Sequence, residues 1–268
     1  MKFSERIVWV TGASSGIGEA TAQAFAREGA HLVLSSRRPD ELARVGQSCL
    51  HPERHTILPL DLTASETFAA AVGTVLARHG RIDVLINNGG SGQRALAADT
   101  TTEVERALME VNYFGPVALT KAVLPAMRAQ RSGHIVVISS VMGHLGTPGR
   151  STYAAAKHAL HGYFDSLRAE LSPEGLKVTV VCPGYVKTAI AENALGPRGE
   201  KTRGPSTALR SGISPQRCAA AILRAVDRAS DEIYVGRWEI CGIYLQRFLP
   251  WLLRRIVRKM KFSVHAPR

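Results

Sequence analysis

Tyr153 and Lys157 are the residues of this sequence whose types and spacing most clearly suggest proton chemistry. They lie four positions apart in a segment, Thr152–Leu171, whose apolar periodicity predicts a helix, so both side chains leave the same helical face. A tyrosine hydroxyl ordinarily ionises near pH ~10, and a neighbouring ammonium lowers that pKa because it stabilises the phenolate. The pair is therefore suited to protonate a carbonyl oxygen or to take the proton of an alcohol. A solvated helical face is the more common explanation for such a pair by itself.

A glycine-rich turn near the N-terminus predicts a phosphate-binding site. The sequence Thr-Gly-Ala-Ser-Ser-Gly-Ile-Gly spans residues 11–18, between a predicted strand and a predicted amphipathic helix. Glycines permit a tight turn and let backbone N–H groups approach a pyrophosphate at the helix N-terminus, where the helix dipole favours negative charge. The spacing is G-x-x-x-G-x-G rather than the G-x-G-x-x-G of the commoner dinucleotide fingerprint. The residues predicted to contact the dinucleotide are Gly12, Ser14, Ser15, Gly16, Ile17 and Gly18.

The end of the second predicted strand bears on the choice between NAD and NADP. It reads Ser35-Ser36-Arg37-Arg38, with no carboxylate before Asp40. NAD sites place a carboxylate here to accept from the adenosine 2′-hydroxyl, whereas a 2′-phosphate requires arginine, which offers two parallel charge-assisted hydrogen bonds. We therefore expect NADP(H). Arg37 is favoured as the phosphate ligand, because the alternative, a solvated arginine at the start of the next helix, fits Arg38 better than Arg37.

The elements that must position these residues alternate between short apolar runs and helical periods. Each run is rich in Val, Ile and Leu, as buried parallel strands are. The predicted strands are Ile7–Val10, His31–Ser35, His55–Leu60, Ile82–Ile86, His134–Ser139 and Lys177–Cys182. The predicted helices are Ile17–Glu28, Ala64–His79, Thr102–Arg128 with a break near Gly115-Pro116, and Thr152–Leu171. This alternation requires parallel pairing with right-handed crossovers, so we expect an α/β fold with a Rossmann-type doubly wound parallel sheet in a single domain.

Further motifs follow the predicted strands in order. They are Asp61-Leu62, Asn87-Asn88-Gly89-Gly90, Asn112, Ser140, Tyr153 with Lys157, and Pro183-Gly184 with Thr188. Together with the glycine-rich turn, these motifs make the chain resemble the short-chain dehydrogenase/reductases from Ile7 to Val235. Two positions depart from the family's pattern. Gly89 stands where the family usually has Ala, and Ser15 stands where many NADP-preferring members have a basic residue.

The resemblance implies roles for four residues. Tyr153 is the acid/base, and Ser140, selected over Ser139 by the family's spacing, hydrogen-bonds the substrate oxygen and stabilises its developing charge. Lys157 lowers the tyrosine pKa and holds the nicotinamide ribose, while Asn112 fixes a water that relays protons. Besides the turn and the arginines, the implied cofactor contacts are Asp61, Leu62, Asn87, Gly89, Tyr153, Lys157, Pro183, Gly184, Val186 and Thr188. The expected substrate contacts are Ser140, Met142, Tyr153 and Tyr185.

The expected reaction is NADP(H)-dependent interconversion of a carbonyl and a secondary alcohol on a hydrophobic, lipid- or steroid-like substrate. Apolar residues near the predicted site favour such a substrate: Val141, Met142, Leu145, Ile190 and Leu195. The segment 189–212, rich in glycine and proline, is long enough to be a substrate loop or lid, although an exposed variable loop also fits. Two other functions stay open. One is a non-catalytic cofactor sensor or membrane scaffold, and the other is an epimerase or dehydratase on the same fold.

The positive charge is concentrated in the C-terminal tail. The chain has 34 Lys+Arg against 22 Asp+Glu, a formal net charge of +12, yet no acidic residue follows Glu239. We expect an oxidoreductase domain over 1–242 and a basic amphipathic helix or tail over 243–268, which resembles the tails of lipid- and steroid-related, acylglycerone-phosphate reductase-like members. Apolar residues on one side and arginines on the other suit a membrane interface through 244–262, or a helix that covers the core or a dimer partner. Nucleic acid is not an expected partner, because aromatic stacking platforms and a recognition motif are lacking.

Cysteine and histidine placement argues against a metal or disulfide framework. The four cysteines, with no C-x-x-C pair, are Cys49, Cys182, Cys218 and Cys241. His144, His158 and His161 are interpreted as surface or packing residues rather than ligands. We therefore predict no metal, a reducing, cytoplasmic location with membrane association at most on the cytoplasmic face, and a homodimer or homotetramer.

Overall fold

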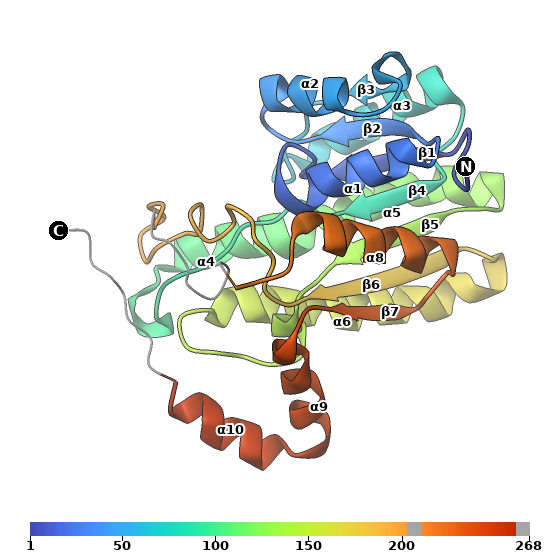
Figure 1. Cartoon of the computed structure of the whole chain (residues 1–268). Helices are drawn as coiled ribbons and strands as arrows, with labels where there is room; N and C mark the ends of the chain where they lie inside the picture. The colour runs from blue at the N-terminus through green and yellow to red at the C-terminus, as the bar shows by residue number, and fades with distance from the viewer. Residues whose placement is uncertain (203–210, 261–268) are drawn as a thin grey trace.

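Parallel strands form the centre of the computed structural model, which describes residues 1–202 and 211–260 (Figure 1). Within those residues the sheet has seven strands in the order β3-β2-β1-β4-β5-β6-β7. They are β1 (Ile7–Thr11), β2 (His31–Ser35), β3 (Thr56–Ile57), β4 (Val84–Asn87), β5 (His134–Ile138), β6 (Lys177–Pro183) and β7 (Glu232–Val235). Strand order reverses between β1 and β4, where doubly wound sheets bind ligands at their carboxyl edge. The predicted α/β doubly wound fold is confirmed.

Helices cover both faces of the sheet. They are α1 (Gly16–Arg27), α2 (Pro39–Ser48), α3 (Phe68–His79), α4 (Thr102–Met109), α5 (Gly115–Gln130), α6 (Ser151–Leu171), α8 (Pro215–Asp227), α9 (Cys241–Phe248) and α10 (Pro250–Arg258). In Figure 1, α1, α2 and α8 lie on the face opposite to α3, α5 and α6. Both faces of the sheet are therefore buried, which is why its strands read as continuous apolar runs.

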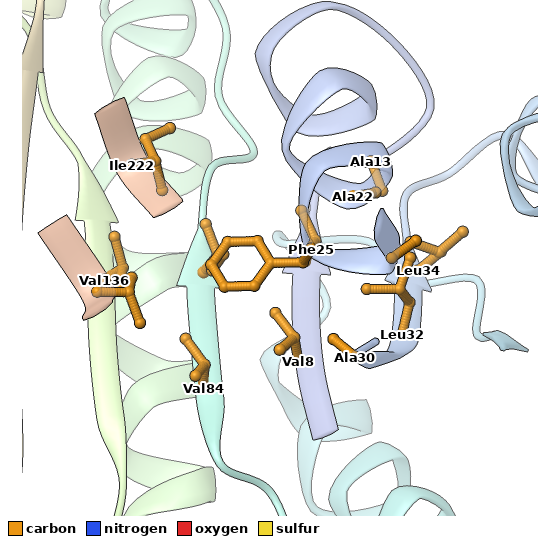
Figure 2. Packing of buried hydrophobic residues seen from close by; sticks show 14 of the residues in the cluster. Val8, Ala13, Ala22, Phe25, Ala30, Leu32, Leu34, Val84, Val136 and Ile222 are labelled. Carbon is orange, nitrogen blue, oxygen red and sulfur yellow. The ribbon is translucent and has the colours of Figure 1, made fainter. Parts of the chain in front are cut away.

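Phe25 of α1 anchors one of the two cores. Its ring is fully buried over Val8 of β1 and Val84 of β4, with Leu32 of β2 beside it (Figure 2). Burial of a phenylalanine side chain contributes ~2–3 kcal/mol. On the other face Trp9 is equally buried, and its indole N–H donates to Ser35 Oγ at 2.9 Å. These contacts hold β1 and β2 in register beneath the glycine-rich turn.

Several elements differ from the sequence prediction, which did not include the helix α8. The strand predicted over His55–Leu60 pairs only at Thr56–Ile57, and the edge strand β7 was not predicted. The break expected near Gly115-Pro116 is instead a π-helical turn, Glu110–Phe114, that joins α4 to α5. Pro116 is tolerated because it lies in the first turn of α5.

The C-terminal tail also departs from the predicted single helix. Pro250 begins α10 after a break at Leu249, so α9 and α10 are two short helices that project from the sheet (Figure 1). Ile243 and Leu253 anchor them in a small apolar cluster with Val141 and Leu145. No helix within residues 1–202 and 211–260 is long and apolar enough to cross a membrane. Residues 203–210 of the predicted loop and 261–268 of the predicted tail lie outside the described residues.

Candidate active site

Ser140 and Tyr153 meet beyond the carboxyl end of β5. Ser140 precedes the short 3-10 turn Val141–Gly143, and its hydroxyl accepts from the Met142 N–H at 3.1 Å. The same hydroxyl lies near the phenolic group of Tyr153, in the first turns of α6, and acts to lower the pKa of that phenol. The two groups predicted to touch the substrate oxygen are thus neighbours.

Burial dominates the ionisation of Tyr153. It raises the tyrosine pKa, while the hydrogen bond from Ser140 and the positive charge of Arg150 act in the opposite direction. The sequence predicted a lowered pKa through Lys157. In the structure burial outweighs the lowering influences, so the phenol holds its proton at neutral pH.

Lys157 lies beneath the tyrosine ring. Its Nζ is 5.6 Å from the ring centroid and donates to the Ile138 carbonyl at 2.8 Å. Burial lowers the pKa of this ammonium to about 8. Lys157 therefore lies on the inward side of α6, near the strand ends, as a cation that loses its proton more easily than an exposed lysine does.

Asn112 occupies the π-helical turn, a local irregularity that often marks functional sites. Its amide nitrogen donates to the carbonyls of Ser91 and Leu108, and its oxygen accepts from the Ser91 N–H at 3.2 Å. A Cβ on Gly90 would lie 2.8 Å from Asn112 Oδ1 and 3.9 Å from Lys157 Nζ. Asn112 and Lys157 thus face the same backbone position, and all four predicted catalytic residues share one site.

The glycine-rich turn has the backbone that its glycines permit. Gly12 and Gly16 have φ of 63° and 60°, and a Cβ on Gly12 would lie 2.8 Å from the Gly89 Cα. Ser15 begins α1 without a side-chain cap, so the first-turn N–H groups are left for another acceptor. Asn88 ties the turn to β4, because its side-chain amide donates to the Thr11 carbonyl at 2.9 Å.

Arg38, rather than Arg37, lies against this turn. Its guanidinium donates to Ser14 Oγ at 2.8 Å and to Ser15 Oγ at 3.1 Å. Arg37 instead lines a hollow of about 480 Å³ together with Asp61. The sequence favoured Arg37 as the phosphate ligand, whereas the geometry brings Arg38 to the turn.

Other predicted cofactor residues lie around the same edge. Asp61 accepts from the Thr63 N–H and hydroxyl, and the Asn87 side chain is buried against Thr120. A Cβ on Gly89 would lie 2.5 Å from Leu62 Cδ1, so this leucine fills the space that the family's usual alanine methyl takes.

The segment after β6 closes the opposite side of the turn. Thr188 lies beside Gly16, since a Cβ on that glycine would be 3.0 Å from Thr188 Cγ2. Pro183 ends β6, and its carbonyl accepts from Ser140 Oγ at 3.4 Å. Val186 is buried and pairs with Ile213.

Glu239 holds this segment, a role that the sequence did not reveal. The buried carboxylate accepts from the N–H groups of Tyr185 at 2.9 Å and Arg237 at 3.1 Å, and a Cβ on Gly184 would collide with it. The rings of Tyr185 and Trp238 lie at a tilt to one another, with centroids 6.3 Å apart. The only signal in the sequence was that Glu239 is the last acidic residue.

Two more residues that sequence reasoning missed surround Tyr153. Gln93 is fully buried, and its side-chain oxygen accepts from the Tyr153 N–H at 3.0 Å. Arg150, just before α6, lies close enough to Tyr153 and Tyr185 for their charges to oppose the lowering of its pKa by burial. Neither belongs to a recognisable motif.

The predicted substrate residues do not all face the same way. Met142 follows Ser140, and its sulfur accepts from the Thr147 hydroxyl at 3.6 Å. Val141 and Leu145, expected to line a substrate wall, pack instead against α9 and α10. These two side chains therefore hold the C-terminal helices against the turn and do not line the site.

A dinucleotide fits the residues present. The positive-φ glycines, the uncapped start of α1 and the serines under Arg38 form an anion-binding edge. This edge adjoins the Ser140–Tyr153 pair. Hydride transfer between a nicotinamide and a bound alcohol or carbonyl requires such an arrangement.

Comparison with known proteins assigns the family. The short chain dehydrogenase family model matches residues 6–197. A dehydrogenase/reductase SDR family protein 7-like of Anopheles gambiae is 42% identical over 268 residues, which cover 95% of this chain and 84% of that protein. A short-chain dehydrogenase from Streptomyces avermitilis is 32% identical with a TM-score of 0.80, covering 96% of this chain and 99% of that one. A metagenomic short-chain oxidoreductase in complex with NADP is 29% identical with a TM-score of 0.73, covering 88% and 98%. The chain therefore belongs to the short-chain dehydrogenase/reductase family, whose fold binds a nicotinamide cofactor, and is a carbonyl/alcohol oxidoreductase.

Proposed function

We propose that the protein uses NADP(H) to interconvert a carbonyl and a secondary alcohol on a hydrophobic, lipid- or steroid-like substrate, with Tyr153 as the acid/base. The observation that carries the proposal is the convergence of Ser140 and Tyr153 near the start of α1, which no side chain caps. The two hydroxyls converge where a substrate oxygen has to lie within reach of both.

The nicotinamide supplies or accepts the hydride when it is bound. Tyr153, whose pKa burial raises, gives its proton to the carbonyl oxygen in reduction. Ser140 donates a hydrogen bond to the same oxygen and stabilises the charge that develops there. Lys157 would hold the ribose hydroxyls of the nicotinamide, and Asn112 would position a water that returns the proton to the lysine.

The preference for the phosphorylated cofactor rests on Arg38. Its guanidinium is fixed over the phosphate-binding turn by Ser14 and Ser15, and the nearest predicted position for a competing carboxylate, Asp40, lies in α2. A 2′-phosphate gains charge-assisted hydrogen bonds there, and a ribose hydroxyl gains far less. The relative solved with NADP is consistent with this choice.

The test is NADPH and NADH oxidation over a panel of ketones that runs from short aliphatic to steroid-like. NADPH-dependent turnover that rises with substrate hydrophobicity supports the proposal. Cofactor binding without turnover would favour the cofactor sensor or scaffold. Substrate conversion with no net NADPH consumption would favour the epimerase or dehydratase.

We also propose that α9 and α10 contact a lipid surface from the cytoplasmic side. Large apolar side chains on these helices are exposed: Tyr244, Phe248, Leu249, Trp251 and Ile256, with Met260 just beyond. Exposed Arg254, Arg255 and Arg258 lie among them. Apolar and aromatic residues mixed with arginines are typical of a helix in a membrane interface, where each cation adds ~1 kcal/mol on anionic lipid.

A further inference from the structure

A compact group of metal-ligating side chains lies next to the active site. Its members come from four elements, namely the end of the 3-10 turn after β5, α6, β6 and β7. They are His144, His161, Cys182 and Glu232. We propose that this cluster binds one divalent transition-metal ion, with zinc the best match. Its members contribute two imidazoles, a thiolate and a carboxylate.

The distances among the four groups approach those of a tetrahedral site. Cys182 Sγ lies 3.3 Å from Glu232 Oε1 and 3.7 Å from His144 Nε2. His144 Nε2 lies 3.0 Å from the same carboxylate oxygen, and one ligand atom from each residue falls within 4.8 Å of all the others. Zinc bonds of ~2.0 Å to nitrogen or oxygen and ~2.3 Å to sulfur place ligand atoms ~3.3–3.6 Å apart. Small movements of side chains suffice to admit the ion.

His161 joins through Nδ1, which lies 3.6 Å from Glu232 Oε1. Its other ring nitrogen, Nε2, lies 2.9 Å from Ser139 Oγ and 3.7 Å from Cys182 Sγ, so with Nδ1 on the ion it can donate to the serine hydroxyl. A Cβ on Gly143 would lie 2.5 Å from Nε2, so glycine at that position makes room for the ring. Histidine ligands of metals nearly always donate their second N–H in this manner.

Glu232 has an outer partner as well. Its second oxygen, Oε2, accepts from the Tyr234 hydroxyl at 3.1 Å, and the Tyr234 ring packs edge-on against His144 with centroids 5.5 Å apart. Two of the four ligands are thus oriented by neighbours that do not bind the ion. A hydrogen-bonded network around a lone carboxylate is the competing explanation for the cluster.

The donor set selects the metal class. Two nitrogens, one sulfur and one oxygen in a tetrahedron suit zinc or cobalt, whereas magnesium and calcium require oxygen ligands. On binding, the Cys182 thiol loses its proton to solvent and the sulfur bonds the ion as thiolate. The thiol is fully buried, while Glu232 and His144 are partly exposed and leave a path for the ion.

The position of the cluster gives the ion a structural consequence. His144 directly follows the turn that begins at Ser140, and Cys182 precedes Pro183, whose carbonyl accepts from Ser140. An ion would join this turn to α6 and to the neighbouring strands β6 and β7. It would thereby restrict the movement of the turn that begins at Ser140.

The experiment is cobalt titration of the full-length, untagged protein after dialysis against a chelator. One Co²⁺ per chain, with tetrahedral d–d bands and a thiolate-to-cobalt charge-transfer band that one equivalent of Zn²⁺ abolishes, is the expected result. Cys182→Ala should remove the charge-transfer band. Glu232→Gln, at a partly exposed position that tolerates an isostere, should weaken cobalt binding at least ~10-fold.

Matched controls separate the site from other groups. His158→Ala changes an exposed histidine of α6, and Cys241→Ser changes the exposed thiol; both should keep the band. Circular dichroism and the unfolding temperature check that each variant folds. An absent band in the wild-type protein, or a band that survives Cys182→Ala, would overturn the proposal in favour of the hydrogen-bonded network.

Discussion

Lys157 Nζ lies 5.6 Å from the centre of the Tyr153 ring and gives its hydrogen bond to the Ile138 carbonyl, not to the tyrosine hydroxyl. Ser140 and the positive charge of Arg150 are the groups that act to lower the pKa of the phenol. The lysine therefore meets the tyrosine at its ring, and the serine acts on its hydroxyl. Removal of either partner should have distinguishable effects.

Tyr153→Phe should reduce kcat by at least ~10³-fold, because it deletes the proton donor while it leaves ring packing intact. Ser140→Ala should lose ~10²–10³-fold, as expected for one donor to a developing oxyanion. Steady-state kinetics measures both, and fluorescence titration should show NADPH affinity within a few-fold of wild type. Activity retained by Tyr153→Phe would refute the assigned role.

Lys157→Met should stabilise the cofactor-free protein near pH 7. Burial lowers the pKa of Lys157 to about 8, below its unfolded value near ~10.4, so the unfolded chain binds more protons between these pH values. The lysine's cost, on the order of 3 kcal/mol at pH 7, shrinks as pH rises through this window. Urea denaturation of both proteins near pH 7 and pH 10 measures the difference. A gain for the variant that does not decline with pH would contradict the buried ammonium.

Gly90→Ala should lower kcat by ~10–100-fold, because the added methyl would lie 2.8 Å from Asn112 Oδ1 and displace the amide beside Lys157. Gly162→Ala is the matched control, since a Cβ there meets nothing within 4 Å. That change in α6 should raise stability by ~0.5–1 kcal/mol and leave kcat unchanged. Equal kcat values for the two variants would show that Asn112 has no part in the reaction.

Arg38→Ala should weaken NADPH binding ~10–100-fold and NADH binding hardly at all, because only NADPH carries the phosphate that the guanidinium meets. Arg37→Ala, tested in parallel, should have the smaller effect, since Arg37 lines the hollow beside Asp61. Dissociation constants for both nucleotides decide the matter. A larger loss of NADPH affinity in Arg37→Ala than in Arg38→Ala would identify Arg37 as the phosphate ligand, as the sequence predicted.

Phe248→Ser combined with Trp251→Ser should abolish flotation with anionic liposomes, because these side chains are 72% and 63% exposed on α9 and α10. Leu50→Ser removes an exposed apolar side chain from another surface and serves as control. If the double variant still floats with the liposomes, and sedimentation shows that it no longer forms a dimer, the two helices form a subunit interface instead.

Local patterns predicted the parts of this protein that depend on few residues. The glycine spacing of residues 11–18 and the four-residue step from Tyr153 to Lys157 each act within one turn of backbone. The strands β1, β2, β5 and β6 were predicted nearly to the residue, since both faces of each are buried. The edge strand β7 was not predicted, because Glu232 is exposed, Tyr234 is only partly buried, and both interrupt the apolar run.

The sequence by itself thus determined the fold class and the family's site residues, because periodicity and motif spacing encode them locally. Only the tertiary structure decided that Arg38 rather than Arg37 meets the turn, since the side-chain directions after β2 depend on how α2 packs. It also brought Cys182 and Glu232 together from 50 positions apart. Contacts between neighbouring parallel strands follow from strand order, which no short stretch of sequence specifies.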